Sequence, residues 1–89
     1  MSTPSPKRYL ALVHKEDGSD YGVSFPALPG CISAGATLEE AEDNAAEALD
    51  LHLRGLAANR EDSEAIDMET VLEQARDEGA VVLFIAPRA

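Results

Sequence analysis

The chain has 89 residues, with 17 acidic side chains against seven of Lys plus Arg, and a single cysteine. A chain this short builds one domain with a thin core, and its net charge of −10 disfavours direct binding of nucleic acid because carboxylates repel phosphate. The lone Cys31 excludes an internal disulfide and fits a reducing cytoplasm, and the longest apolar run, Ala80–Ala86, is too short to span a membrane.

The start of the chain predicts a leader and a β-hairpin. Residues 1–7 are rich in Ser and Pro, so we expect a disordered leader ahead of a single domain over residues 8–87. The apolar patterns predict two strands, Arg8–His14 and Tyr21–Phe25, which are joined by the polar loop Glu16–Asp20. Alternation in the second strand places its aromatic and Val side chains on the buried face.

A Pro- and Gly-rich turn follows the second strand. Pro26 cannot donate a ladder hydrogen bond, and Gly30 accepts a positive φ without steric cost. Strand pairing is therefore expected to stop near Phe25 and to resume in a third strand, Cys31–Gly35.

The main helix is predicted from Leu38 to about Ala58. Thr37 and Glu40 form a Thr-x-x-Glu capping box at its start. The apolar positions recur every three or four residues, so one face is expected to pack on the sheet while the acids lie mostly off that face. The apolar stripe consists of Leu38, Ala41, Ala45, Ala48, Leu49, Leu53 and Leu56.

A second, shorter helix and a last strand complete the prediction. After a polar loop, Asp67 caps a helix from Met68 to Asp77 or Glu78, which Gly79 ends and whose inward residues are Val71, Leu72 and Ala75. Val81–Ile85 is apolar on both faces, which is typical of a strand inside a sheet. Because it follows a helical crossover, we expect it beside the first strand and parallel to it.

The predicted order is thus β-β-β-α-α-β, an α+β fold. It combines a three-stranded antiparallel unit with a parallel fourth strand, packed on one main helix. Because the core is thin, we also expect a homo-oligomer in which copies share an apolar face or a sheet edge.

The turn and cap resemble those of a known family, the HicB-type antitoxins of bacterial toxin–antitoxin pairs. The family pattern is Phe-Pro-Asp-Leu-Pro-Gly, a strand of small residues, Gly-Asp-Thr and an acidic helix. Here the matching residues are Phe25–Gly30 and Gly35–Thr37. Ala27 and Ala36 stand where the family usually has acids, which preserves the turn and the cap but removes two carboxylates.

The resemblance covers about Arg8–Ala86 and implies a partial RNase H-like, HicB-like fold that binds a partner and does not catalyse a reaction. In this family the domain sequesters HicA, a small basic toxin that cleaves mRNA. Many members add a C-terminal DNA-binding module. This chain ends at Pro87–Ala89, so we expect no C-terminal DNA-binding domain and no direct contact with nucleic acid.

Neither catalysis nor a metal or other cofactor is expected. Cys31 with His14 or His52 lacks any flanking signature of a nucleophile and its base. A two-metal nuclease needs converging carboxylates, at least one of them inside the sheet, and the predicted strands carry none.

The residues predicted to bind a partner surround the turn and follow the acidic side of the main helix. The stretch between Lys15 and Arg54 contains no basic residue and would attract a basic protein. A solvated helix face and a purely structural turn are the simpler alternatives. The predicted partner-binding residues are Tyr21, Ser24, Leu28, Glu39, Glu42, Asp43, Glu47 and Asp50.

Two functions of different classes remain open besides an enzyme. One is a HicB-like antitoxin module that neutralises a HicA-type toxin. The other is a stand-alone, self-associating structural or scaffolding domain without a toxin partner.

Overall fold

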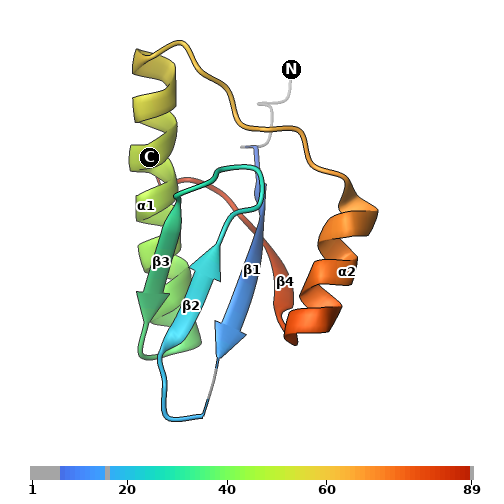
Figure 1. The fold of residues 1–89 in the computed structure, drawn as a ribbon. Helices are drawn as coiled ribbons and strands as arrows, with labels where there is room; N and C mark the ends of the chain where they lie inside the picture. Colours follow the sequence, from blue (N-terminus) through green and yellow to red (C-terminus); the bar gives the residue numbers. More distant parts are fainter. Residues whose placement is uncertain (1–6, 16, 89) are drawn as a thin grey trace, which may run out of the picture.

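The computed structural model describes residues 7–15 and 17–88. Its elements follow the predicted order β-β-β-α-α-β, which confirms the α+β class (Figure 1). The leader predicted at residues 1–7 lies, except for Lys7, outside the described residues. The elements are β1 Tyr9–Lys15, β2 Tyr21–Ser24, β3 Ile32–Gly35, α1 Leu38–Ala58, α2 Met68–Glu78 and β4 Val81–Ile85.

Both helices begin at the predicted caps. The Thr37 hydroxyl accepts a hydrogen bond from the Glu40 amide at 3.1 Å, and the Asp67 carboxylate accepts one from the Glu69 amide at 3.1 Å. Gly79 ends α2 with a φ of 68°, in the left-handed region that favours glycine. In the described part of the chain, neither helix has the length and apolar character needed to cross a membrane.

The four strands form one sheet in the order β3-β2-β1-β4, in which all neighbours are antiparallel. The prediction that β4 lies beside β1 is confirmed, but the predicted parallel direction is wrong. Tyr9 pairs with Ile85 and Val13 with Val81, so the two strands run in opposite directions.

The reversal of β4 follows from the number of helical passes. A single helical crossover would return the chain to the start of β1 and give a parallel strand. Here α1 runs back along the sheet and α2 runs forward again, so β4 starts at the end of the sheet where β1 and β3 finish (Figure 1).

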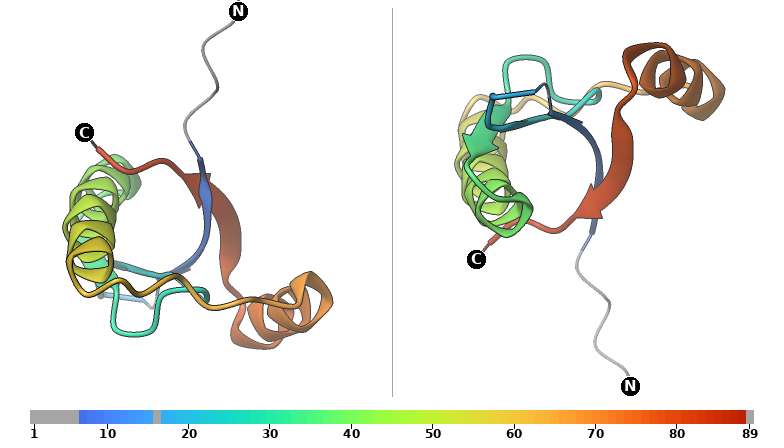
Figure 2. Two further views of the ribbon diagram at one scale, coloured as in Figure 1. Left: turned by 90° about the horizontal axis from the view of Figure 1, so that it is seen from above. Right: turned by 90° about the horizontal axis from the view of Figure 1, so that it is seen from below.

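The two helices lie on opposite faces of the sheet (Figure 2). Strand β1 is buried on both faces: Ala11 and Val13 join the core under α1, whereas Leu10 and Leu12 pack with Val71 of α2. Because strand side chains alternate, one strand supplies two separate cores.

The two helices pack mainly on different strands of the sheet. Helix α1 contacts mainly β3 and β2, whereas α2 packs over β1 and β4. Strand β4 ends the strand order and is therefore an edge strand, in which Val81 and Phe84 are exposed, not the fully buried strand that its composition predicts. Leu38 and Leu72, both predicted to face inward, are also exposed because they lie at the margins of their helices' buried stripes.

Helix α1 approaches β3 most closely at Gly35. A Cβ atom added to Gly35 would lie 2.4 Å from the backbone nitrogen of Ala41, a residue that is itself completely buried. The obstacle is helix backbone, which cannot rotate away as a flexible side chain does. The Gly in the Gly35–Thr37 segment is thus required by helix packing.

Replacing Gly35 with Ala is expected to push α1 away from the sheet and to lower the free energy of unfolding by about 1–3 kcal/mol, the usual cost of overpacking a core. Gly22→Ala is the matched control, because Gly22 also lies in a strand and a Cβ there meets nothing within 4 Å. Urea denaturation followed by circular dichroism measures both variants. Equal stability of the two variants would contradict the packing constraint at Gly35.

Candidate functional site

Two consecutive β-turns connect β2 to β3. The Leu28 amide donates to the Phe25 carbonyl and the Cys31 amide donates to the Leu28 carbonyl, each at 3.0 Å. A proline occupies the second position of each turn, where its fixed φ is already suitable. Gly30 follows the second proline with a φ of 88°, as a type II turn requires.

Leu28 points inward from this double turn. Its side chain is only 1% exposed and belongs to the core under α1, although it was predicted among the partner-binding residues around the turn. The turn is also tied to the segment between the helices, since the Glu64 amide donates to the Ala27 carbonyl at 2.7 Å. Leu28 therefore anchors the turn and does not offer a surface contact.

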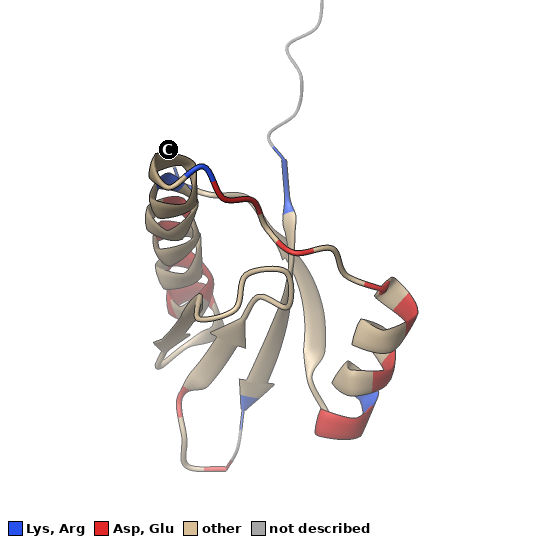
Figure 3. Cartoon of the chain, turned by 45° about the horizontal axis from the view of Figure 1, so that its top comes forward, with Lys and Arg blue, Asp and Glu red and all other residues tan. Residues whose placement is uncertain are grey.

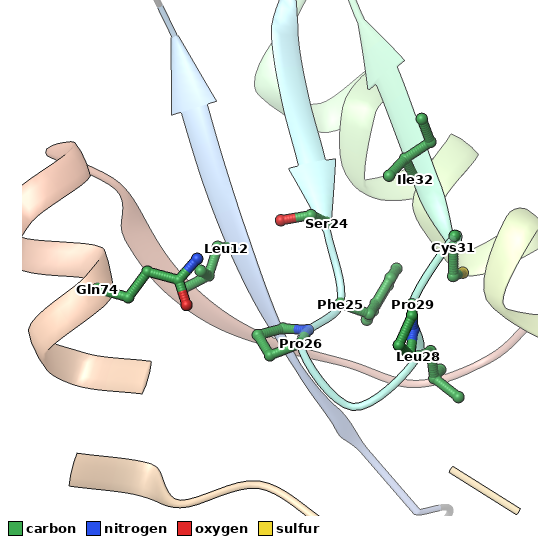
Figure 4. A pocket seen from close by; sticks show the side chains of 10 residues that line it. Leu12, Ser24, Phe25, Pro26, Leu28, Pro29, Cys31, Ile32 and Gln74 are labelled. Carbon is green, nitrogen blue, oxygen red and sulfur yellow. The ribbon is translucent and has the colours of Figure 1, made fainter. Parts of the chain in front are cut away.

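An open pocket of about 330 Å³ lies on the α2 side of the same turn (Figure 4). Leu12 and the half-buried Ser24 come from the neighbouring strands β1 and β2, and Gln74 of α2 lies on the opposite side. Pro26 and Ile32 belong to the rim near the turn and β3. The Ser24 hydroxyl points toward the side of Gln74, so the pocket combines apolar walls with two neutral polar groups (Figure 4).

A hydrogen-bond network ties α2 to the end of β1 beside this pocket. His14 Nε2 donates to Glu78 Oε1 at 2.7 Å, and the Gln74 side chain also hydrogen-bonds to Glu78. Both hydrogen bonds lower the pKa of Glu78 from its ordinary value, and the one from Gln74 has the larger effect. This network could not be predicted from the sequence, because His14 and Glu78 are 64 positions apart.

Most acidic positions of α1, coloured red in Figure 3, lie off the buried stripe of Ala41, Ala45 and Leu49, whereas Glu42 and Asp50 are half-buried at its margins. Two of them form ion pairs within the chain: Asp43 with Arg88 at 3.2 Å and Asp50 with Arg54 at 3.0 Å. In residues 7–15 and 17–88, the remaining predicted acids, Glu39, Glu42 and Glu47, have no ion pair. We call these five residues the α1 acidic surface.

The eight predicted residues do not form one site. The α1 acidic surface and Ser24 lie on opposite faces of the sheet, and Leu28 is buried between the sheet and α1. Tyr21 is half-buried against the α1-side core, with Lys15 Nζ 5.5 Å from the centre of its ring. Sequence spacing did not show this separation because it depends on which face of the sheet each helix covers.

The three side chains considered for nucleophilic chemistry have separate surroundings. Burial raises the pKa of the Cys31 thiol, which is opposite to what a reactive thiolate needs. His14 is bound to Glu78, and His52 lines a second pocket near Pro29 and Leu56. Within the described ranges, no three His, Cys, Asp or Glu side chains gather closely enough to hold a metal ion.

The family model described as "HicB_like antitoxin of bacterial toxin-antitoxin system" matches residues 9–86. The chain belongs to this HicB-like antitoxin family. Among solved structures, the HicB-like fold is similar to the antitoxin HicB of Burkholderia pseudomallei, with a TM-score of 0.72 and 34% identity over 89% of this chain and 61% of that one. A HicA3–HicB3 toxin–antitoxin complex contains a chain with the same fold, with a TM-score of 0.70 and 22% identity over 92% of this chain and 99% of that one.

A curated relative is an uncharacterized 14.9 kDa protein encoded in the rep-hol intergenic region of Haemophilus phage HP1. It is 46% identical to this HicB-like chain over 54 residues, which make up 61% of this chain and 38% of the phage protein. The chain thus spans less than two thirds of the phage protein and of the Burkholderia antitoxin.

The Glu78 network predicts a pH dependence of stability. Because folding lowers the pKa of Glu78, its contribution is fully present above the ordinary pKa near 4.5 and is lost as the pH falls through the lower, folded-state pKa. Glu78→Gln should therefore unfold more easily than the natural chain at pH 6, and the difference should shrink below pH 4.5. Thermal unfolding across this range measures it, and a difference that stays constant with pH would contradict the assignment.

Proposed function

We propose that this chain is the antitoxin of a toxin–antitoxin pair, and that it binds and neutralises a small basic mRNA-cleaving toxin of the HicA type. The observation that carries the proposal is the match of the HicB-like antitoxin family across residues 9–86. The related HicB3 occurs in a complex with HicA3, which gives a partner of the corresponding kind. A cytoplasmic location is part of the same proposal.

The α1 acidic surface is the contact that suits a basic toxin. Glu39, Asp43 and Glu47 follow one another at four-residue intervals, so their Cα atoms rise by about 6 Å at each step along one side of the helix. Glu39 and Glu47 keep their carboxylates free of ion pairs in the described part of the chain. Their charge favours rapid association with a cationic partner.

Arg54 and Arg88 reduce the negative charge of the α1 acidic surface. Each is exposed and pairs with a single carboxylate of α1, and exposed ion pairs are weak enough to be exchanged for better ones. A basic side chain of the toxin can displace either arginine at little cost. Asp43 and Asp50 then become contacts with the partner.

The proposed action is masking without catalysis. An acidic surface that covers the basic face of a ribonuclease competes with RNA, because both present anionic oxygens to the same cations. This action needs no nucleophile, and it agrees with the burial of Cys31 and with the location of the acids on helices and loops.

The double variant Glu39→Gln/Glu47→Gln should lower the association rate with the toxin by about tenfold at low salt, since it removes two unpaired charges from the contact. The toxin to use is the product of the adjacent reading frame if that product is small and basic, with its catalytic residue inactivated. Surface plasmon resonance at several salt concentrations measures the rate.

Glu73→Gln/Asp77→Asn is the matched control. It changes the net charge by the same amount, at exposed positions of α2 on the other face of the sheet. The proposal predicts a much smaller effect for this control. An equal fall in both variants would place the charge effect outside α1, and no binding of the natural chain at micromolar concentration would contradict the antitoxin function itself.

A further inference from the structure

The segment Ala86–Arg88 leaves the end of β4 and crosses to α1 (Figure 2). The Arg88 amide donates a hydrogen bond to the Ala46 carbonyl at 3.1 Å, and Nη2 of Arg88 lies 3.2 Å from Oδ1 of Asp43. An open hollow of about 320 Å³ lies between α1 and β4 at this place, and Ala86 lines it. The segment therefore forms a strap from the last strand to the main helix, which we call the 86–88 strap.

The sequence of the 86–88 strap favours this path. Pro87 fixes its own φ and keeps Ala86 extended, so the strap loses few conformations when it settles on the helix. Ala46 has no side chain beyond Cβ, which leaves room for the Arg88 backbone. A carbonyl oxygen has two lone pairs, so Ala46 can accept this hydrogen bond besides one within the helix. The backbone contact places the Arg88 side chain over the first turns of α1.

Arg88 occupies a hollow with an anionic lining. The hollow has a volume of about 370 Å³ and contains three carboxylates, those of Glu39, Glu40 and Asp43. In residues 7–15 and 17–88, only Asp43 among these three has an ion pair, and its partner is Arg88. Thr37 and Asn44 complete the lining. We call this hollow the α1 cation site, because a guanidinium of the chain itself already lies in it.

Arg88 is held loosely in the α1 cation site. The side chains of Arg88 and Asp43 are 55% and 57% exposed, and exposed ion pairs contribute little. The N-terminal end of a helix also carries a partial positive charge, which opposes a cation there. Tethering offsets this weakness, because a side chain attached beside its site has an effective concentration in the roughly millimolar range. Arg88 can therefore keep out single, weakly bound cations and yield to a partner with several basic groups.

We propose, on the basis of the function proposed above, that the α1 cation site binds a basic side chain of the toxin and that Arg88 is an internal competitor for this site. Binding requires the 86–88 strap to release its guanidinium. The affinity of every occupant is then reduced by the fraction of chains in which the site is open. Arg88 thereby sets how basic a protein must be in order to bind.

Isothermal titration calorimetry with a hexa-arginine peptide tests the competition without any toxin, after circular dichroism has shown that each variant is folded. Arg88→Gln should tighten peptide binding by about three- to tenfold, because it leaves the site open. Arg88→Lys keeps a cation on the strap and should bind the peptide as the natural chain does.

Arg76→Gln is the matched control. It removes one positive charge at an exposed position of α2, on the other face of the sheet. Salt screens charges at such a separation, so the affinity for hexa-arginine should change by less than about twofold. Equal effects of Arg88→Gln and Arg76→Gln would overturn the proposal.

Nuclear magnetic resonance of the natural chain follows the displacement directly. Hexa-arginine should move the side-chain Nε–H signal of Arg88 together with the amide signals of Glu39 and Asp43. An Arg88 signal that stays in place while the amides of α1 move would also overturn the proposal.

The inactive toxin separates the role of Arg88 from the antitoxin function. Arg88→Gln should raise the affinity for the toxin by about the same factor as for the peptide, because both must displace the same side chain. An unchanged affinity for the toxin would overturn the role of Arg88. If the natural chain binds no toxin but hexa-arginine still displaces Arg88, the antitoxin function fails while the competition at the α1 cation site stands.

Discussion

The burial of β1 on both faces is the constraint on which the rest of this molecule depends. Its four central residues, Leu10–Val13, alternate between two cores. Neither core can be completed by the sheet itself, so each face needs a helix. The chain must therefore place α1 on one side, cross over, and place α2 on the other before it can add β4.

This arrangement separates the surfaces available to partners. Helix α1 packs mainly on β2 and β3, so most of its carboxylates lie on the α1 side of the molecule. Helix α2 covers β1 and β4 on the other side, beside the open edge. The domain thus carries a charged surface along α1 and exposed apolar side chains at the β4 edge.

Local features were predictable because their causes are local. Thr37, Asp67 and Gly79 each act on atoms within a few residues, and the double turn needs only Pro26, Pro29 and Gly30 in order. The family resemblance of the same segment also identified the fold. Gly35 lies in the same matched segment, but the close approach of α1 that requires a glycine there becomes visible only in the structure.

Features that depend on the path of the chain were not predictable. The direction of β4 is set by the second helical pass, and Leu28 is buried because α1 and the segment at Glu64 close over the turn. The His14–Glu78 bond joins elements far apart in the sequence. The sequence analysis could name individual candidate residues. Their division between the two faces of the sheet follows from the tertiary arrangement.

Nuclear magnetic resonance of the labelled chain, titrated with unlabelled inactive toxin, tests the central claim most directly, because it maps the contact residue by residue. The account predicts that amide shifts change along the outer side of α1, at Glu39, Asp43 and Glu47, while those of α2 and β4 stay in place. Shifts confined to β4, α2 or the pocket beside Ser24 would contradict it.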